Sequence, residues 1–153
     1  MTARYAHTNL IASDWQRLAR FYQDVFGCEP VPPERDLSGH WLDKATGIGD
    51  AHIKGVHLRL PGYGDSGPTL EIFQYDDMPK RPSICPNTPG FTHIAFAVED
   101  VAAIAQSILQ HGGSIIGDLT VLEIPGAGVL TFQYLADPEG NILEVQRMES
   151  MAP

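Results

Sequence analysis

The sequence predicts an α+β fold built from two similar halves, each running strand, helix and then several strands. Three observations support this: a repeat at a fixed offset, two amphipathic stretches that begin at capping residues, and alternating strand patterns after each stretch. The first module is expected over residues 1–77 and the second over 90–148. A proline-rich linker, 78–89, separates them, and residues 149–153 form a tail.

The internal repeat has an offset of 93 − 7 = 86 residues. The matched pairs are His7 with His93, Asp14 with Asp100, and Gly27 with Gly113. An aromatic residue also begins each copy, Tyr5 in the first and Phe91 in the second. Because a strand, a cap, a helix and a terminating glycine share one register, we interpret the two halves as copies of one unit.

The helices are expected at residues 15–26 and 101–110, where apolar residues recur on one face. Ser13 with Gln16 fits a capping box for the first helix, and Asp100 is a good N-cap for the second. Asp14 is also interpreted as a cap. Gly27 and the Gly112–Gly113 pair predict left-handed helix ends.

Strands are expected after each helix, bounded by turn residues. Their ranges are 28–32, 52–60 and 69–75 in the first half, and 114–116, 129–135 and 142–147 in the second, with a short extra strand near 121–124. The first half also carries a long insertion near 33–51, the kind of segment in which function is often found. His40 and Trp41 in this insertion are interpreted as an exposed loop rather than a lid.

Composition and charge restrict the class of partner. The formal net charge of −9 would repel a phosphate backbone, so no nucleic acid partner is expected. No apolar run approaches the ~20 residues that span a membrane, and the N-terminus shows no signal pattern. The two cysteines, Cys28 and Cys85, are interpreted as reduced thiols. We therefore expect a cytoplasmic protein that acts on a small molecule.

Four polar residues occupy equivalent strand positions in the two halves. His7 and His93 lie on the first strand of each half, and Glu71 and Glu144 on the last. Each glutamate alternates with aliphatic residues expected to face the helix, so all four side chains are expected on the opposite sheet face. Two imidazoles and two carboxylates suit one divalent ion such as Zn, Ni, Co, Mn or Fe.

Most of the chain resembles the vicinal oxygen chelate superfamily, which includes glyoxalase I, methylmalonyl-CoA epimerase, extradiol dioxygenases and the fosfomycin and bleomycin resistance proteins. The resemblance is carried by residues 7–10 (HTNL), 20–27 (RFYQDVFG), 93–98 (HIAFAV) and 137–144 (DPEGNILE). It implies two βαβββ modules that form an open, incompletely closed β-barrel around a metal site. Whether such a barrel closes within one chain or across the expected homodimer is left open.

The ligand set His7, Glu71, His93 and Glu144 is most similar to that of glyoxalase I, with the epimerase next. The resemblance therefore implies a lyase or isomerase that works by 1,2-proton transfer through a metal-stabilised enediolate, with Glu144 or Glu71 as the base. The alternatives are an Fe(II) extradiol-type dioxygenase and a non-catalytic protein that binds a drug. Ile11 and Tyr75 stand where bacterial glyoxalase I has groups that hold glutathione, so the resemblance implies a different substrate.

Two further residues are candidates for substrate binding. His57 and Arg59 alternate with aliphatic residues and are expected beside Glu71, where an arginine could hold a carboxylate or phosphate. A solvated barrel edge is the alternative for this pair. Phe132 and Tyr134 could line either the cleft or the core, because the parity of their strand is not fixed by the sequence.

Overall fold

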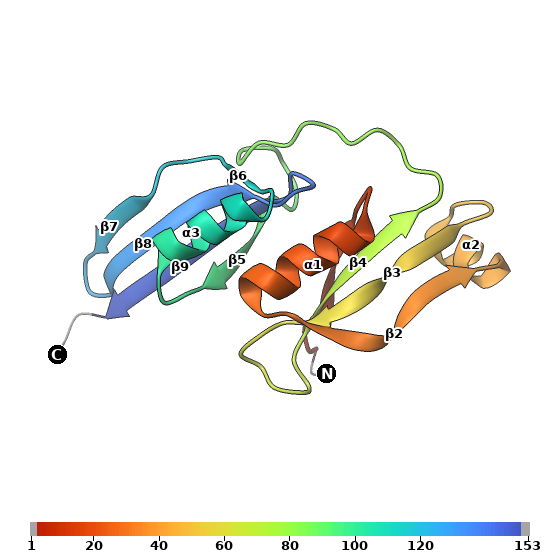
Figure 1. Ribbon diagram of the computed structural model, residues 1–153, viewed down its shortest axis with the longest axis horizontal. Helices are drawn as coiled ribbons and strands as arrows, with labels where there is room; N and C mark the ends of the chain where they lie inside the picture. The colour runs from red at the N-terminus through yellow and green to blue at the C-terminus, as the bar shows by residue number, and fades with distance from the viewer. Residues whose placement is uncertain (1–2, 151–153) are drawn as a thin grey trace. The chain divides into compact units, whose positions relative to one another are not determined.

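The computed structural model describes residues 3–150 and contains two compact units that divide between Arg81 and Pro82. Residues 151–153 of the expected tail lie outside the described part. Each unit is a mixed α+β structure with one open sheet, and within the described residues neither sheet closes into a barrel (Figure 1). The predicted α+β class is confirmed.

The first unit, called unit 1 here, has a four-stranded sheet in the order β1-β4-β3-β2. Its elements follow the chain as β1 (His7–Ile11), α1 (Trp15–Phe26), β2 (Glu29–Ser38), α2 (His40–Thr46), β3 (His52–Arg59) and β4 (Thr69–Tyr75). β1 runs parallel to β4, and the other pairs are antiparallel. β2 is the edge strand, a position that tolerates the prolines at 30, 32 and 33.

The second unit, unit 2, repeats this plan with a five-stranded sheet. Its elements are β5 (His93–Ala97), α3 (Val101–Gln110), β6 (Ser114–Ile115), β7 (Thr120–Ile124), β8 (Gly128–Ala136) and β9 (Ile142–Ser150). β5 runs parallel to β9 as β1 does to β4. The short strand expected near 121–124 is confirmed as β7.

The helix bounds agree with the sequence, but the caps differ in detail. Asp14, not Ser13, is the N-cap of α1 and accepts a hydrogen bond of 2.9 Å from the Arg17 amide. Asp100 caps α3 in the same way. The predicted Ser13 capping box is therefore wrong, because the chain enters the helix one residue later, at the position that matches Asp100 in the repeat.

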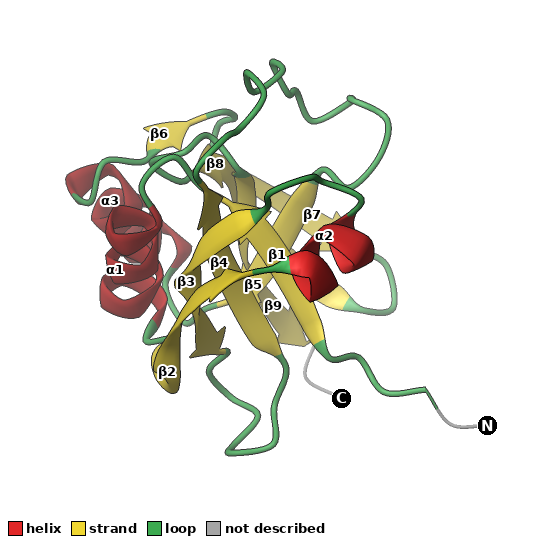
Figure 2. Cartoon of the chain, turned by 90° about the vertical axis from the view of Figure 1, so that its right-hand side faces the viewer, coloured by secondary structure: helices red, strands yellow, loops and turns green. Residues whose placement is uncertain are grey.

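The insertion at 33–51 is ordered rather than an exposed loop. β2 continues to Ser38, and α2 follows on the side of the unit 1 sheet opposite α1 (Figure 2). Buried residues of α2, β3 and β4 form one apolar cluster, with Leu37 and Tyr75 at its edge; its core members are Leu42, Ala51, Ile53 and Phe73. Trp41 is exposed as expected, but on a helix.

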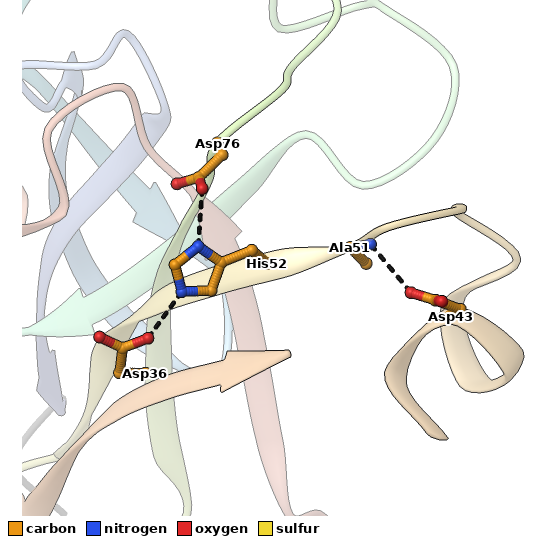
Figure 3. A network of polar contacts seen from close by, with 5 residues as sticks. All are labelled: Asp36, Asp43, Ala51, His52 and Asp76. Carbon is orange, nitrogen blue, oxygen red and sulfur yellow. Dashed lines mark hydrogen bonds and ion pairs between the residues drawn. The ribbon is translucent and has the colours of Figure 1, made fainter. Parts of the chain in front are cut away.

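A histidine bridge ties the ends of three segments of unit 1 together (Figure 3). The His52 ring on β3 contacts Asp36 of β2 through Nε2 and Asp76, just after β4, through Nδ1, each at 2.6 Å. The Asp43 side chain on α2 accepts a hydrogen bond of 2.9 Å from the Ala51 amide. These contacts fasten the insertion to the sheet at the start of β3.

No helix among residues 3–150 is long and apolar enough to cross a membrane.

Candidate metal centre

The core of each unit lies between its sheet and its long helix. In unit 1, Leu70 and Ile72 are buried, and α1 lies against β3 and β4. In unit 2, Leu143 and Val145 are buried, and α3 lies against β8 and β9. Glu71 and Glu144 alternate with these residues, so each glutamate lies on the sheet face away from the helix, as predicted.

A histidine on the neighbouring parallel strand approaches each glutamate. In unit 1, His7 Nδ1 lies 3.3 Å from Glu71 Oε1, and in unit 2, His93 Nε2 lies 3.2 Å from Glu144 Oε2. The register is the same in both units, since each histidine precedes by two residues the position that pairs with the glutamate. Each unit therefore brings together two of the four predicted ligands.

The donor set fits a divalent ion. Metal bonds of about 2.0–2.2 Å place neighbouring ligand atoms roughly 3.0–3.5 Å apart, and both histidine–glutamate distances lie in that range. Both glutamate side chains are only 13% exposed, which shields them from water without isolating them. Among residues 3–150, no group of three or more His, Cys, Asp or Glu side chains is arranged to hold an ion.

A second partner reaches each glutamate from the antiparallel neighbour strand. His57 pairs with Glu71 across β3 and β4, and its Nε2 lies 3.4 Å from the same Oε1 that His7 approaches. Tyr134 pairs with Glu144 across β8 and β9 and is hydrogen-bonded to it. These two positions are equivalent in the two sheets, although the sequence offset between them is not that of the repeat.

Burial shifts the pKa of both partners. Desolvation lowers the pKa of His57, the Glu71 charge opposes this, and the charges of Arg35 and His7 add to the lowering. Desolvation also raises the pKa of Tyr134, and its hydrogen bond to Glu144 raises it further. The phenol is therefore protonated at neutral pH and donates to the Glu144 carboxylate.

Tyr134 resolves the parity that the sequence left open. Its ring lies 5.1 Å from the His93 ring and 6.0 Å from Phe132, centroid to centroid, so both aromatic residues are on the glutamate face. Leu135, the neighbour of Tyr134 on β8, is fully buried and faces the helix, so alternation along the strand places Tyr134 on the opposite face. This alternation could not be used without the turn lengths that fix the β8–β9 pairing.

Arg59 lies on the glutamate face, but its charge is already countered. Its Nη1 is 3.3 Å from Glu29 Oε2 and 3.8 Å from Asp65 Oδ1. It lines a cavity of about 370 Å³ between the end of α1 and the β3–β4 loop; the other lining residues are Gly27, Glu29, Leu60, Pro61, Gly62, Gly64 and Asp65. Arg59 thus lies on the expected sheet face, and its ion-pair partners are carboxylates of the chain itself.

Arg35 was missed by the sequence analysis. It pairs with Gly55 on β3, which places it on the same face as His57 and Glu71, and its Nη1 is buried without a hydrogen-bond partner. The residue lies in a segment expected to be a loop, so its side-chain direction could not be predicted. The only indication in the sequence was that the 33–51 insertion contains an arginine.

Comparison with known proteins agrees with this architecture. The profile of the Glyoxalase/Bleomycin resistance protein/Dioxygenase superfamily matches residues 4–145. Glyoxalase 1 of Caenorhabditis elegans is 29% identical over 106 residues, 68% of this chain but 35% of that protein, so the chain spans about a third of that relative's length.

Solved structures show the same fold. A glyoxalase family protein from Bacillus cereus superposes with a TM-score of 0.80 at 15% identity, over 97% of this chain and 95% of the other. A variant of the fosfomycin resistance protein FosX from Listeria monocytogenes, complexed with Mn(II) and 1S,2S-dihydroxypropylphosphonic acid, gives 0.58 at 17% identity, over 97% and 95%.

Proposed function

Because the chain belongs to the Glyoxalase/Bleomycin resistance protein/Dioxygenase superfamily, we propose that it is a metal-dependent lyase or isomerase that transfers a proton between adjacent carbons of a small oxygenated substrate. The observation that carries the proposal is the histidine–glutamate pair that both units present in the same register. A binding protein without a metal has no need for two such pairs, each with its carboxylate largely shielded from water.

The proposed ligands of one divalent ion are His7, Glu71, His93 and Glu144. Zn, Ni, Co, Mn and Fe all suit two imidazoles and two carboxylates. When bound, the ion would supply Lewis-acid chemistry that polarises a substrate carbonyl and makes the neighbouring C–H bond more acidic.

We assign the base to Glu144. Its carboxylate accepts the proton from the carbon next to the carbonyl and returns it to the adjacent carbon, so no net proton is gained or lost. Glu144 contacts one imidazole and the Tyr134 phenol, whereas two imidazoles meet at Glu71 Oε1. Glu71 is assigned the role of the ligand that stays in place during the reaction.

His57 and Arg59 are proposed to bind the substrate on the glutamate face of unit 1. His57 is a quarter exposed and can contact both Glu71 and a substrate oxygen. Arg59 can donate hydrogen bonds to a substrate from the wall of its cavity. The nearby carboxylates of Glu29 and Asp65 weaken its attraction for an anion. The proposed assembly is a homodimer, and the proposed partner is a small molecule rather than a nucleic acid.

The test is proton exchange at the substrate carbon in heavy water, followed by NMR over a panel of small 2-hydroxy and 2-keto carbonyl compounds. The protein is loaded in turn with Zn, Ni, Co or Mn, and a chelator-treated sample is the control. Exchange that needs the metal supports the proposal. Oxygen uptake on catechols with Fe(II) would indicate a dioxygenase instead, and ligand binding without exchange would indicate a sequestering protein.

The hemithioacetal of methylglyoxal and glutathione should be a poor substrate. Ile11 and Tyr75 offer no group to hold the charged tripeptide, and Tyr75 packs instead beside the apolar cluster of α2. We expect a kcat/KM below about 10⁴ M⁻¹s⁻¹, the low end of ordinary enzymes. A value above this in a standard glyoxalase assay would show that other residues bind glutathione.

A further inference from the structure

Arg35 is half-buried, and one nitrogen of its guanidinium is buried with no hydrogen-bond partner. Its Nη1 has no hydrogen-bond partner, and among the described residues no carboxylate lies within ion-pair distance of its guanidinium. Two other arginines have carboxylate partners: Arg59 lies beside Glu29, and Arg147 lies 2.7 Å from Glu149. A buried N–H group without a hydrogen-bond partner is costly, so its presence calls for an explanation.

The strand register places Arg35 next to the glutamate pair of unit 1. Along β2, Val31 pairs with His57, Arg35 with Gly55, and Leu37 with Ile53. Residues paired across strands share a face of the sheet, so Arg35 lies on the face that carries His57 and Glu71. This face of unit 1 therefore carries a guanidinium, an imidazole and a carboxylate on three neighbouring strands.

Apolar side chains flank Arg35 on its other side. Leu37, two residues further along β2, packs against the cluster that contains Leu42 of α2 and Phe73 of β4. Along β2, Arg35 thus stands between the position paired with His57 and the apolar Leu37. Low polarity on one side strengthens the attraction between this cation and any anion that reaches it.

We propose that Arg35 binds an anionic oxygen group of the substrate, so that the substrate is a carboxylate or a phosphate ester. A guanidinium can bind two oxygens of such a group in parallel, which fixes its orientation beside Glu71. The net charge of −9 would otherwise repel an anion, and one unpaired cation at the site overcomes this locally. The inference rests on the proposed function, which supplies the reaction. The negative charge of the substrate is inferred from Arg35 alone.

The experiment measures two properties of Arg35→Met, which keeps the apolar stem and removes the charge. Inorganic phosphate and lactate are titrated by calorimetry into chelator-treated protein, and the thermal midpoint is measured without ligand. We expect phosphate or lactate to bind wild type and to bind Arg35→Met at least about 10-fold more weakly. The midpoint should rise by about 2–4 °C, because an unpaired charge has been removed. Arg35→Lys should retain part of the binding, since it keeps the charge without the fork.

Arg147→Met is the matched control and should leave the binding of both anions unchanged, because Arg147 lies in unit 2 and is paired with Glu149. The proposal is overturned if wild type binds neither anion, if Arg35→Met keeps wild-type affinity, or if its midpoint falls. Loss of binding in Arg59→Met with retention in Arg35→Met would also overturn it, by moving the anion site to Arg59. Because the titration uses metal-free protein, Arg35-dependent binding would stand even if metal-dependent proton exchange were not found.

Discussion

Units 1 and 2 present the same pair of side chains but surround it differently. In both, a histidine on the first strand meets a glutamate on the last, and a third residue pairs with the glutamate from the antiparallel side. That third residue is His57 in unit 1 and Tyr134 in unit 2. Unit 1 also adds the 33–51 insertion on the glutamate face. In the proposed function, the repeated pairs hold the metal, and the residues that differ between the units act on the substrate.

The largest expected effect is a loss of proton exchange, and it tests whether the two equivalent glutamates have different roles. Glu144→Gln should reduce proton exchange by about 10² to 10⁴, because an amide cannot accept the proton. Metal content should fall less, since the amide oxygen can still coordinate. Glu71→Gln is the matched variant and should cost less exchange. NMR exchange rates with metal analysis in parallel decide the matter.

Retained exchange in Glu144→Gln together with its loss in Glu71→Gln would exchange the two roles. Retention in both variants would place the base elsewhere, with His57 as the next candidate.

The elements that occur in both units were predicted from the sequence better than those that occur in unit 1 alone. The bounds of α1 and α3, the strands that carry His7 and Glu144, and the face of each glutamate all follow from periodicity and caps. The α2 segment and the course of β2 did not follow, because proline-rich edge strands carry a weak strand pattern and α2 is stabilised by contacts with β3 and β4. The direction of Arg35 depends on that unpredicted segment.

The residues that contact the glutamates could also be predicted only in part from the sequence. His57 was predicted beside Glu71 from simple alternation. Tyr134 could not be assigned to Glu144, because its side depends on the turn that connects β8 to β9 and sets their register. Gly113, the third match of the repeat, is not the left-handed residue; Gly112 is, with φ of 88°, because α3 ends earlier than α1.

The next effect concerns the insertion, which only unit 1 possesses. Leu42 is 5% exposed at the centre of the α2 cluster, so Leu42→Ala should lower the free energy of unfolding by about 2–5 kcal/mol. Leu122→Ala on β7 of unit 2, where the side chain is 51% exposed, should change it by less than about 0.5 kcal/mol. Urea denaturation measures both. Equal effects would mean that the insertion does not pack on the sheet.

The smallest effect concerns the His52 bridge, also confined to unit 1. Hydrogen bonds to Asp36 and Asp76 raise the pKa of His52, so its contribution is complete below its ordinary value of 6.5 and is lost as the pH rises through the raised value. The hydrogen bond to His52 lowers the pKa of Asp36, so its contribution is present above 3.8 and is lost as the pH falls through the lowered value.

The bridge should therefore stabilise unit 1 most between about pH 4 and pH 6.5. His52→Gln should lower the thermal midpoint in this window and converge with wild type at higher pH. The difference should be small, because both aspartates are largely exposed. A constant difference from pH 5 to pH 9 would show that the ring acts by packing rather than by charge.

We propose that the two histidine–glutamate pairs bind one ion. Titration of metal-free protein with Co(II), followed by its visible absorption, gives both the stoichiometry and the ligand dependence. We predict one ion per chain, and loss of that ion in His7→Ala and in His93→Ala alike, although the two residues belong to different units. Two ions per chain, with each variant losing only one of them, would contradict the claim and make each pair a separate site.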